Sequence, residues 1–164
     1  MQKNDPFIKL VVFTLAQTNY AIVADNVLEI VDSGSITSVP NINQFVEGAY
    51  NFKSRIIPIF DLKRIVGMDV SKKNDEAHKI LILTYEDRLI GFKIDDVLDI
   101  FHLASFQLKT VILKNFHSGI EGIGEIQSVL FFYLNIEKII QSKKPFELEA
   151  QDYIIKEYKE AKKK

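Results

Sequence analysis

The chain has 164 residues, of which 47% are hydrophobic and 26% are charged, values that are ordinary for a soluble globular domain. Its 21 basic and 22 acidic residues give a net charge of −1, so there is no electrostatic reason to expect a nucleic-acid partner. The absence of cysteine excludes disulfides, thiolate zinc sites and cysteine nucleophiles, and no apolar run reaches the ~20 residues of a membrane-spanning helix. We therefore expect a cytoplasmic protein without direct membrane insertion.

Short β-strands are the predicted elements along most of the chain. Apolar residues recur at period two or in short runs between turn residues, which is typical of strands. The branched and aromatic residues, among them 12 phenylalanines, also favour a pleated sheet. The predicted strands span residues 8–15, 20–31 (one strand or a bent pair), 36–39, 52–60, 80–85, 89–101, 108–113, 122–126 and 129–134.

Two helical turns and one longer helix complete the predicted elements. Asp61 can cap a turn over 62–66, and Asn135 can cap one over 136–140, because such side chains accept hydrogen bonds from N–H groups at a helix start. After residue 142 the chain becomes charged, with acidic residues first and lysines last, as suits the dipole of a helix over 147–164. The expected buried face of this helix consists of Ala150, Ile154, Tyr158 and Ala161.

Two stretches of the chain look like copies of two others. Residues 11–30 align without a gap with residues 81–100, at an offset of 70, and residues 47–66 align with residues 121–140, at an offset of 74. The matches include polar and glycine positions, which favours duplication over a chance similarity of apolar patterns. Two units of this size predict two small barrels, because closure removes the exposed edges of a small sheet.

The duplication divides the chain into expected units. We expect the first barrel over roughly residues 18–76 and the second over 77–142, with a strand at 7–16 that can pair with either. A charged helix or tail follows over 143–164.

Residues for catalysis or metal binding do not converge in the sequence. His78, His102 and His117 are 24 and 15 residues apart, which fits no compact metal motif. No serine lies in a nucleophile-elbow pattern, and the glycine-rich run 118–124 lacks the lysine and helix of a phosphate-binding loop. We expect no enzyme activity, no cofactor and no metal.

Acidic residues gather on two predicted strands, at Asp25, Glu29, Asp95, Asp96 and Asp99. In a strand, Asp95 and Asp99 share one face, which could hold a cation. Because both repeats have this pattern, we favour solvated strand residues and local ion pairs. A barrel that binds a small ligand or nucleic acid is the alternative function, although the sequence offers no basic, aromatic-lined face.

Four runs of residues between and along the strands resemble the signature of the CheW family. They are ITSVP at 36–40, FVEGAYN at 45–51, IIPIFDL at 56–62 and GFKIDDVLDI at 91–100. The resemblance covers about residues 8–141, and the order, spacing and proline positions agree. It implies an all-β fold of two SH3-like five-stranded barrels packed on a shared apolar core, followed here by the C-terminal helix.

The resemblance also implies a function. Proteins of this family are non-catalytic adaptors of the receptor arrays, and they bind the regulatory domain of the histidine kinase CheA and the cytoplasmic tip of a chemoreceptor. Further copies of the same fold can close rings with them.

The resemblance implies candidate binding residues as well. In the family, a glutamate after a valine of the first barrel and an arginine in an Asn-x-Arg-Gly stretch are linked to coupling. The matching positions here are Val27, Glu29, Asn51, Lys53 and Ser54. Lys53 can still pair with Glu29, although it lacks the bidentate fork of arginine. Ser54 stands where glycine would adopt a positive φ easily. Arg55 is a sixth candidate, although adjacent strand residues point to opposite faces.

Overall fold

The structure is a computed structural model of the chain, and it describes residues 7–34, 36–39, 44–68, 78–104, 109–112, 119–142 and 148–163. The strands in these residues are β1 (Phe7–Leu15), β2 (Thr18–Val23), β3 (Val27–Asp32), β4 (Val46–Phe52), β5 (Arg55–Asp61), β6 (Lys79–Tyr85), β7 (Arg88–Ile94), β8 (Asp96–Ala104), β9 (Lys109–Ile112), β10 (Ile120–Ile126) and β11 (Val129–Leu134). The helices are α1 (Leu62–Ile65), α2 (Ile136–Ser142) and α3 (Leu148–Lys162), with a 3-10 turn η1 (Ala24–Asn26). Within this described part, no helix is long and apolar enough to span a membrane.

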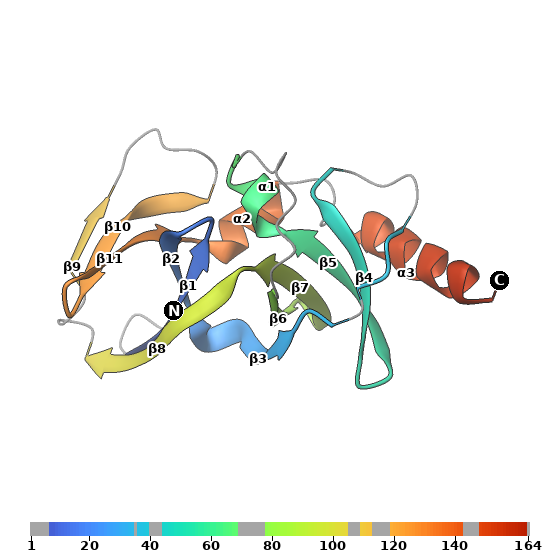
Figure 1. The fold of residues 1–164 in the computed structure, drawn as a ribbon, viewed down its shortest axis with the longest axis horizontal. Coiled ribbons are helices and arrows are strands. Elements are labelled where there is room, and N and C mark those ends of the chain that lie inside the picture. Colours follow the sequence, from blue (N-terminus) through green and yellow to red (C-terminus); the bar gives the residue numbers. More distant parts are fainter. Residues whose placement is uncertain are drawn as a thin grey trace.

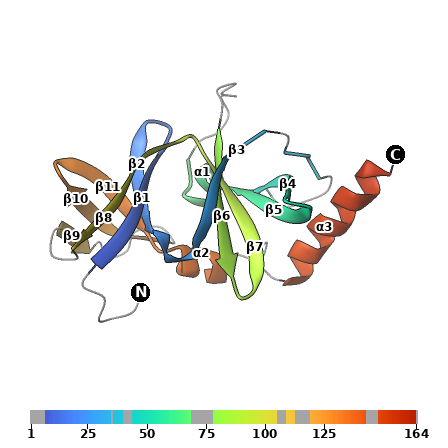
Figure 2. The same cartoon turned by 90° about the horizontal axis from the view of Figure 1, so that it is seen from below.

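The strands form two sheets that lie side by side along the long axis of the molecule (Figure 1). One has six strands in the order β8-β1-β2-β11-β10-β9, and the other has five in the order β3-β6-β7-β5-β4. Neighbouring strands are antiparallel, except that β2 with β11 and β5 with β7 are parallel. In the view from below, α3 lies beside β4 and β5, at the end of the molecule away from the six-stranded sheet (Figure 2).

Each sheet curls into a small SH3-like barrel with its own apolar interior. In the five-stranded sheet, Val31 on the edge strand β3 packs into the same apolar cluster as Tyr50 and Phe52 on the opposite edge strand β4. This cluster, to which both edge strands contribute, shows the closure that the sequence predicts, since closure shields edge strands from water and from other chains. The all-β fold with two barrels and a C-terminal helix is therefore confirmed.

The strand orders also show the duplication. The offset of 70 residues relates β1, β2 and β3 to β6, β7 and β8, and the offset of 74 relates β4 and β5 to β10 and β11. Replacing each strand by its counterpart turns the order β3-β6-β7-β5-β4 into β8-β1-β2-β11-β10. The sixth strand, β9, pairs Val111 with Ile123, and Thr37 makes one bridge to Ala49 at the equivalent place in the other sheet.

The repeats exchange strands, so the barrels do not divide the chain at residue 76 as expected for units 18–76 and 77–142. The five-stranded sheet takes β6 and β7 from the second unit, and the six-stranded sheet takes β2 from the first. The strand at 7–16 corresponds to β1, which pairs with β2 and β8. The exchange has a physical basis, since β1, β2, β6 and β7 supply apolar side chains to the core that both barrels share.

The shared core explains why several strands are apolar at nearly every position. Along β1, Ile8, Leu10 and Val12 face the interior of the six-stranded barrel, whereas Val11 and Phe13 face the shared core. A strand that is buried on both faces needs apolar residues throughout rather than at alternate positions. The aromatic rings of Phe60 and Phe92 meet in the same shared core, with centroids 6.1 Å apart.

The predicted helix caps are confirmed. The Asp61 carboxylate accepts a hydrogen bond from the Lys63 backbone N–H at 3.0 Å, and the Asn135 side chain accepts one from the Lys138 N–H at 3.1 Å. Of the expected apolar face of α3, Ile154 and Tyr158 are buried in the shared core and Ala161 is exposed. The side chain of Ala150 lies outside the described residues.

Candidate functional site

Glu29, Lys53 and Ser54 lie together at one edge of the five-stranded barrel. Lys53 and Ser54 form the turn between β4 and β5, and Glu29 lies on β3, the opposite edge strand of the same sheet. The Lys53 Nζ is 2.9 Å from Glu29 Oε2, and the two side chains are 71% and 40% exposed. Closure of the barrel thus brings together two charges that are 24 residues apart in the sequence.

The turn itself has an unusual backbone. Both φ angles are positive, 48° at Lys53 and 68° at Ser54, which is the pattern of a type I′ hairpin turn. This turn usually contains glycine or asparagine, because other residues meet steric strain at positive φ. Ser54 therefore adopts the conformation for which glycine would be better suited. The Lys53 ammonium group also lies 4.9 Å from the centroid of the Phe52 ring, which restricts its position further.

A β-bulge presents Glu29 to the turn. The register between β3 and β6 shifts between Val27 and Glu29, so that Leu28 is the extra residue and is 55% exposed. Val27 is half-buried and packs against the shared core, which makes it a support for the site rather than an exposed contact. Asn51 is exposed on β4, opposite Ile56 of β5.

Arg55 lies on a separate feature of the surface. Together with Asn26 and residues of the β6–β7 turn and α2, it lines an open cleft of about 740 Å³. The other lining residues are Thr84, Tyr85, Glu86, Asp87, Leu89, Glu137 and Gln141. The structure thus brings Glu29, Lys53 and Ser54 together and places Arg55 on a cleft with three carboxylates.

Exposed apolar side chains are a feature that the sequence reasoning missed. Leu98 is 51% exposed and occupies the bulge on β8 that corresponds to Leu28 on β3. Phe7 and Ile100 are also exposed on the six-stranded barrel. The signal was the match of Leu28 with Leu98 in the two repeats, since each follows directly on a valine and so departs from period-two alternation.

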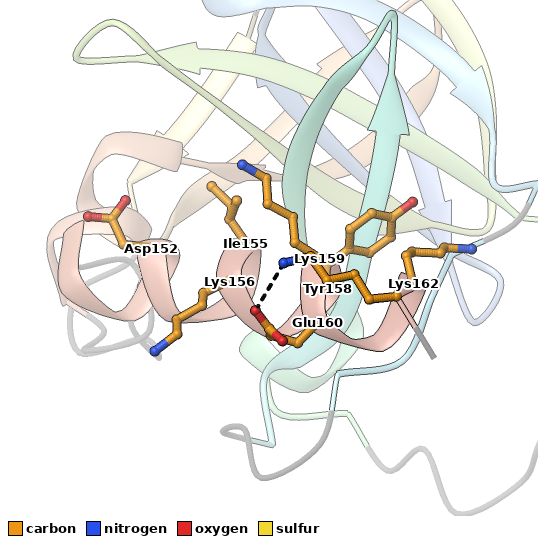
Figure 3. Close-up of a pocket in the computed structure, with 8 residues that line it drawn as sticks. Asp152, Ile155, Lys156, Tyr158, Lys159, Glu160 and Lys162 are labelled. Atoms are coloured by element: carbon orange, nitrogen blue, oxygen red, sulfur yellow. Dashed lines mark ion pairs between the residues drawn. The ribbon is translucent and has the colours of Figure 1, made fainter.

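A further concavity, of about 540 Å³, lies on α3 and contains none of the expected site residues (Figure 3). All of its lining residues belong to this one helix or its end: Asp152, Ile155, Lys156, Tyr158, Lys159, Glu160, Lys162 and Lys163. Lys163 forms an ion pair with Glu160 at 3.7 Å. The close-up shows charged side chains extending from the helix in different directions rather than toward one point.

The expected acidic cluster is distributed over local contacts. The side chain of Asp96 accepts a hydrogen bond from the Val97 N–H, and that of Asp99 accepts one from the Ile100 N–H. Asp95 forms an ion pair with Lys63. Among the residues that the structure describes, no group of three or more histidine, aspartate or glutamate side chains is arranged to hold a metal ion.

Comparison with known proteins gives a consistent result. The model of the CheW-like domain family matches residues 9–144. The chain is 31% identical to the chemotaxis protein CheW of Thermotoga maritima, over 79% of this chain and 85% of that protein. It is 26% identical to the chemotaxis protein CheW of Helicobacter pylori, over 85% and 86% of the two chains.

A solved structure shares the fold. The scaffolding protein TtCheW of Thermoanaerobacter tengcongensis superposes with a TM-score of 0.72, at 24% identity, covering 86% of this chain and 97% of that one. The helix α3 lies beyond the residues that the family model matches. From the match over 9–144 and the similarity to the Thermotoga protein, the chain belongs to the CheW-like domain family.

Proposed function

We propose that the chain is a chemotaxis coupling protein. In this function it is a scaffold without catalytic activity, located in the cytoplasm at membrane-associated receptor arrays. It joins the signalling tips of chemoreceptors to the regulatory domain of the histidine kinase CheA, and further copies of the fold extend the assembly into rings. The observation that carries the proposal is the CheW-like match over residues 9–144, supported by relatives that bear the name chemotaxis protein CheW.

The geometry of Glu29 and Lys53 supports a role in partner binding. An ion pair as exposed as this one contributes only ~0.2–1 kcal/mol to folding. Its charges are therefore largely available to another protein, and charged groups at the rim of an interface mainly determine partner choice and association rate. These residues occupy the positions that the family resemblance associates with coupling, so we propose Glu29, Lys53, Ser54 and the exposed Asn51 as partner contacts.

Two barrels with unlike surfaces suit a scaffold. The five-stranded barrel presents the Glu29–Lys53 pair next to the exposed Leu28, whereas the six-stranded barrel presents the three exposed apolar side chains of Phe7, Leu98 and Ile100. One molecule can thus contact two different partners at the same time. Contacts of ~1,000 Å² each are sufficient when many copies assemble, because the assembly adds avidity.

Reversal of the charge at Lys53 tests the site. In Lys53→Glu, two carboxylates replace the ion pair, whose charged atoms are 2.9 Å apart in the unmodified chain. A partner whose acidic group binds the Lys53 ammonium then meets a negative charge instead. We expect capture of the receptor tip or of the kinase regulatory domain to weaken about tenfold, corresponding to ~1.4 kcal/mol. The measurement is titration calorimetry with each purified partner.

Lys79→Glu is the matched control. Lys79 on β6 forms an exposed ion pair with Asp32 on β3 at 2.7 Å. Like the Glu29–Lys53 pair, it lies on the five-stranded barrel and includes a carboxylate of β3. This variant should bind both partners as the unmodified protein does. If folded Lys53→Glu also binds both partners with unchanged affinity, Lys53 is not part of the contact surface.

A further inference from the structure

Among the strands that the structure describes, the chain passes from one barrel to the other twice. The first crossing is η1, which connects β2 to β3, and the second is Asp95, which connects β7 to β8. All other consecutive strands belong to the same sheet. Polar contacts at these two crossings can therefore influence how the barrels are oriented.

At the second crossing, one carboxylate contacts both barrels, by a hydrogen bond on one side and by an ion pair on the other. Asp95 Oδ2 accepts a hydrogen bond from the Ala16 N–H at 2.7 Å, and the Asp95 N–H donates to the Thr14 carbonyl at 3.1 Å. Both of these partners belong to the six-stranded barrel. On the other side, Asp95 Oδ1 lies 2.6 Å from Lys63 Nζ of α1 and 3.5 Å from Nε2 of His78, which precedes β6.

This contact is shielded from water, which strengthens it. The Asp95 and Lys63 side chains are only 18% and 16% exposed. On the side of the six-stranded barrel, the hydrogen bond from the Ala16 N–H to the Asp95 carboxylate involves a charged group, so it is stronger than a neutral one and depends on distance and angle. On the side of the five-stranded barrel, the Lys63 ion pair is short and largely shielded, and two charges attract each other more strongly there than in water. The apolar core that the barrels share has no such directional preference. Apolar burial holds the barrels together, whereas the Asp95 contact can define one orientation.

The first crossing lacks the same contact. The offset of 70 residues relates Asp95 at the second crossing to Asp25 at the first. The described residues provide no hydrogen bond or ion pair for the Asp25 side chain. By the offset of 74, the position of Lys63 is taken by Glu137, a carboxylate that cannot neutralise another one. Glu137 and Glu86 line the open cleft of about 740 Å³ at this side of the molecule. The two crossings thus share a backbone plan, and only one has the charged contact.

We propose that Asp95 is a positioning residue that fixes the angle between the two barrels. If the chain is the coupling scaffold proposed above, on which this part of the inference rests, Asp95 also sets the spacing between its two partner-binding surfaces. The spacing matters because simultaneous engagement of two sites fails when their geometry does not match.

The test is the distance between the barrels in Asp95→Asn. The chain has no cysteine, so spin labels can be attached at Lys9→Cys in β1 and Thr84→Cys in β6, two exposed positions in different barrels. We expect the distance distribution, measured by double electron–electron resonance, to broaden or shift in Asp95→Asn. Asparagine keeps the shape of the side chain but removes its attraction for Lys63.

Glu47→Gln is the matched control. Glu47 and Lys93 form an ion pair at 2.9 Å with side chains 25% and 21% exposed, but both lie in the five-stranded barrel. The control should retain the original distance distribution. An unchanged distance distribution in Asp95→Asn would overturn the proposal. If Asp95→Asn does not fold, the same measurement is made on Lys63→Gln, which removes the other charge of the ion pair.

Partner binding separates the two proposals. Asp95→Asn should bind the isolated kinase domain and the isolated receptor tip with the affinities of the unmodified chain. It should form less of the complex that contains all three proteins. If the unmodified chain binds neither partner, the proposed function fails, and the distance measurement still decides the role of Asp95. If Asp95→Asn forms the complex of all three proteins in full yield, its role in spacing the surfaces is refuted.

Discussion

Ser54 adds backbone strain to the turn beside Glu29, which lowers the stability of the folded chain. Its φ of 68° is well suited to glycine, whereas serine meets steric strain there, so the site combines an exposed ion pair with a strained backbone. The sequence comparison predicted that lysine at 53 can pair with Glu29, and the structure contains that pair. Arg55 lies elsewhere, as expected for a neighbouring residue on a strand, whose side chain points to the other face.

Substitution of this serine should therefore stabilise the protein. We expect Ser54→Gly to raise the free energy of unfolding by about 0.5–1 kcal/mol, because relief of the strain exceeds the entropy that glycine adds to the unfolded chain. Urea unfolding measures the change. Ser128 occupies the equivalent turn with a φ of 67° and should respond alike, whereas Ser33→Gly, whose φ is not positive, should lower stability.

His78 makes stability depend on pH. Burial lowers the pKa of His78 below its ordinary value of 6.5, helped by Lys93 and Lys63 and opposed by Asp95 and Asp61. Between the folded and unfolded pKa values the unfolded chain binds more protons, so stability decreases as the pH falls below about 6.5. His78→Gln should lose less stability over this range in urea unfolding at stepped pH. Identical pH profiles for the two proteins would contradict the assignment.

At the scale of elements, the signals in the sequence differ in strength. Of the two interpretations of residues 20–31, the bent pair is correct, since η1 separates β2 from β3. The single strand predicted over residues 89–101 is divided at Asp95 into β7 and β8. The hairpin of β4 and β5 was missed, because Lys53-Ser54 has none of the glycine or asparagine that announces a two-residue turn. Of the predicted strand at 36–39, only the bridge of Thr37 to Ala49 is formed.

The helix α3 should contribute to stability through Ile154. This side chain is 2% exposed within the shared core, although the helix lies beyond the family match. We expect Ile154→Ala to lower the free energy of unfolding by about 2–4 kcal/mol, the usual cost of such a cavity. Tyr153→Ala, at an exposed position on the same helix, should cost much less. Equal losses in urea unfolding would show that α3 is not part of the core.

At the scale of the whole molecule, the duplication was readable from the sequence and the exchange of strands was not. Gapless matches at two offsets preserve the residues that a repeated backbone needs, including Gly48 and Gly122 at corresponding bulges. Apolar periodicity reports which side of a strand is buried, but not which strand lies next to it. The exchange therefore depends on pairing between distant segments such as β3 with β6, which no local pattern specifies.

The most direct test of the central claim is titration calorimetry of the purified chain with a CheA regulatory domain and with a receptor signalling-tip fragment, followed by sedimentation of the three-component mixture. We expect micromolar binding to each partner, ~8 kcal/mol at 1 μM, and one complex that contains all three proteins. A folded chain that binds neither partner, or that binds them only in competition with each other, would contradict its assignment as a coupling scaffold.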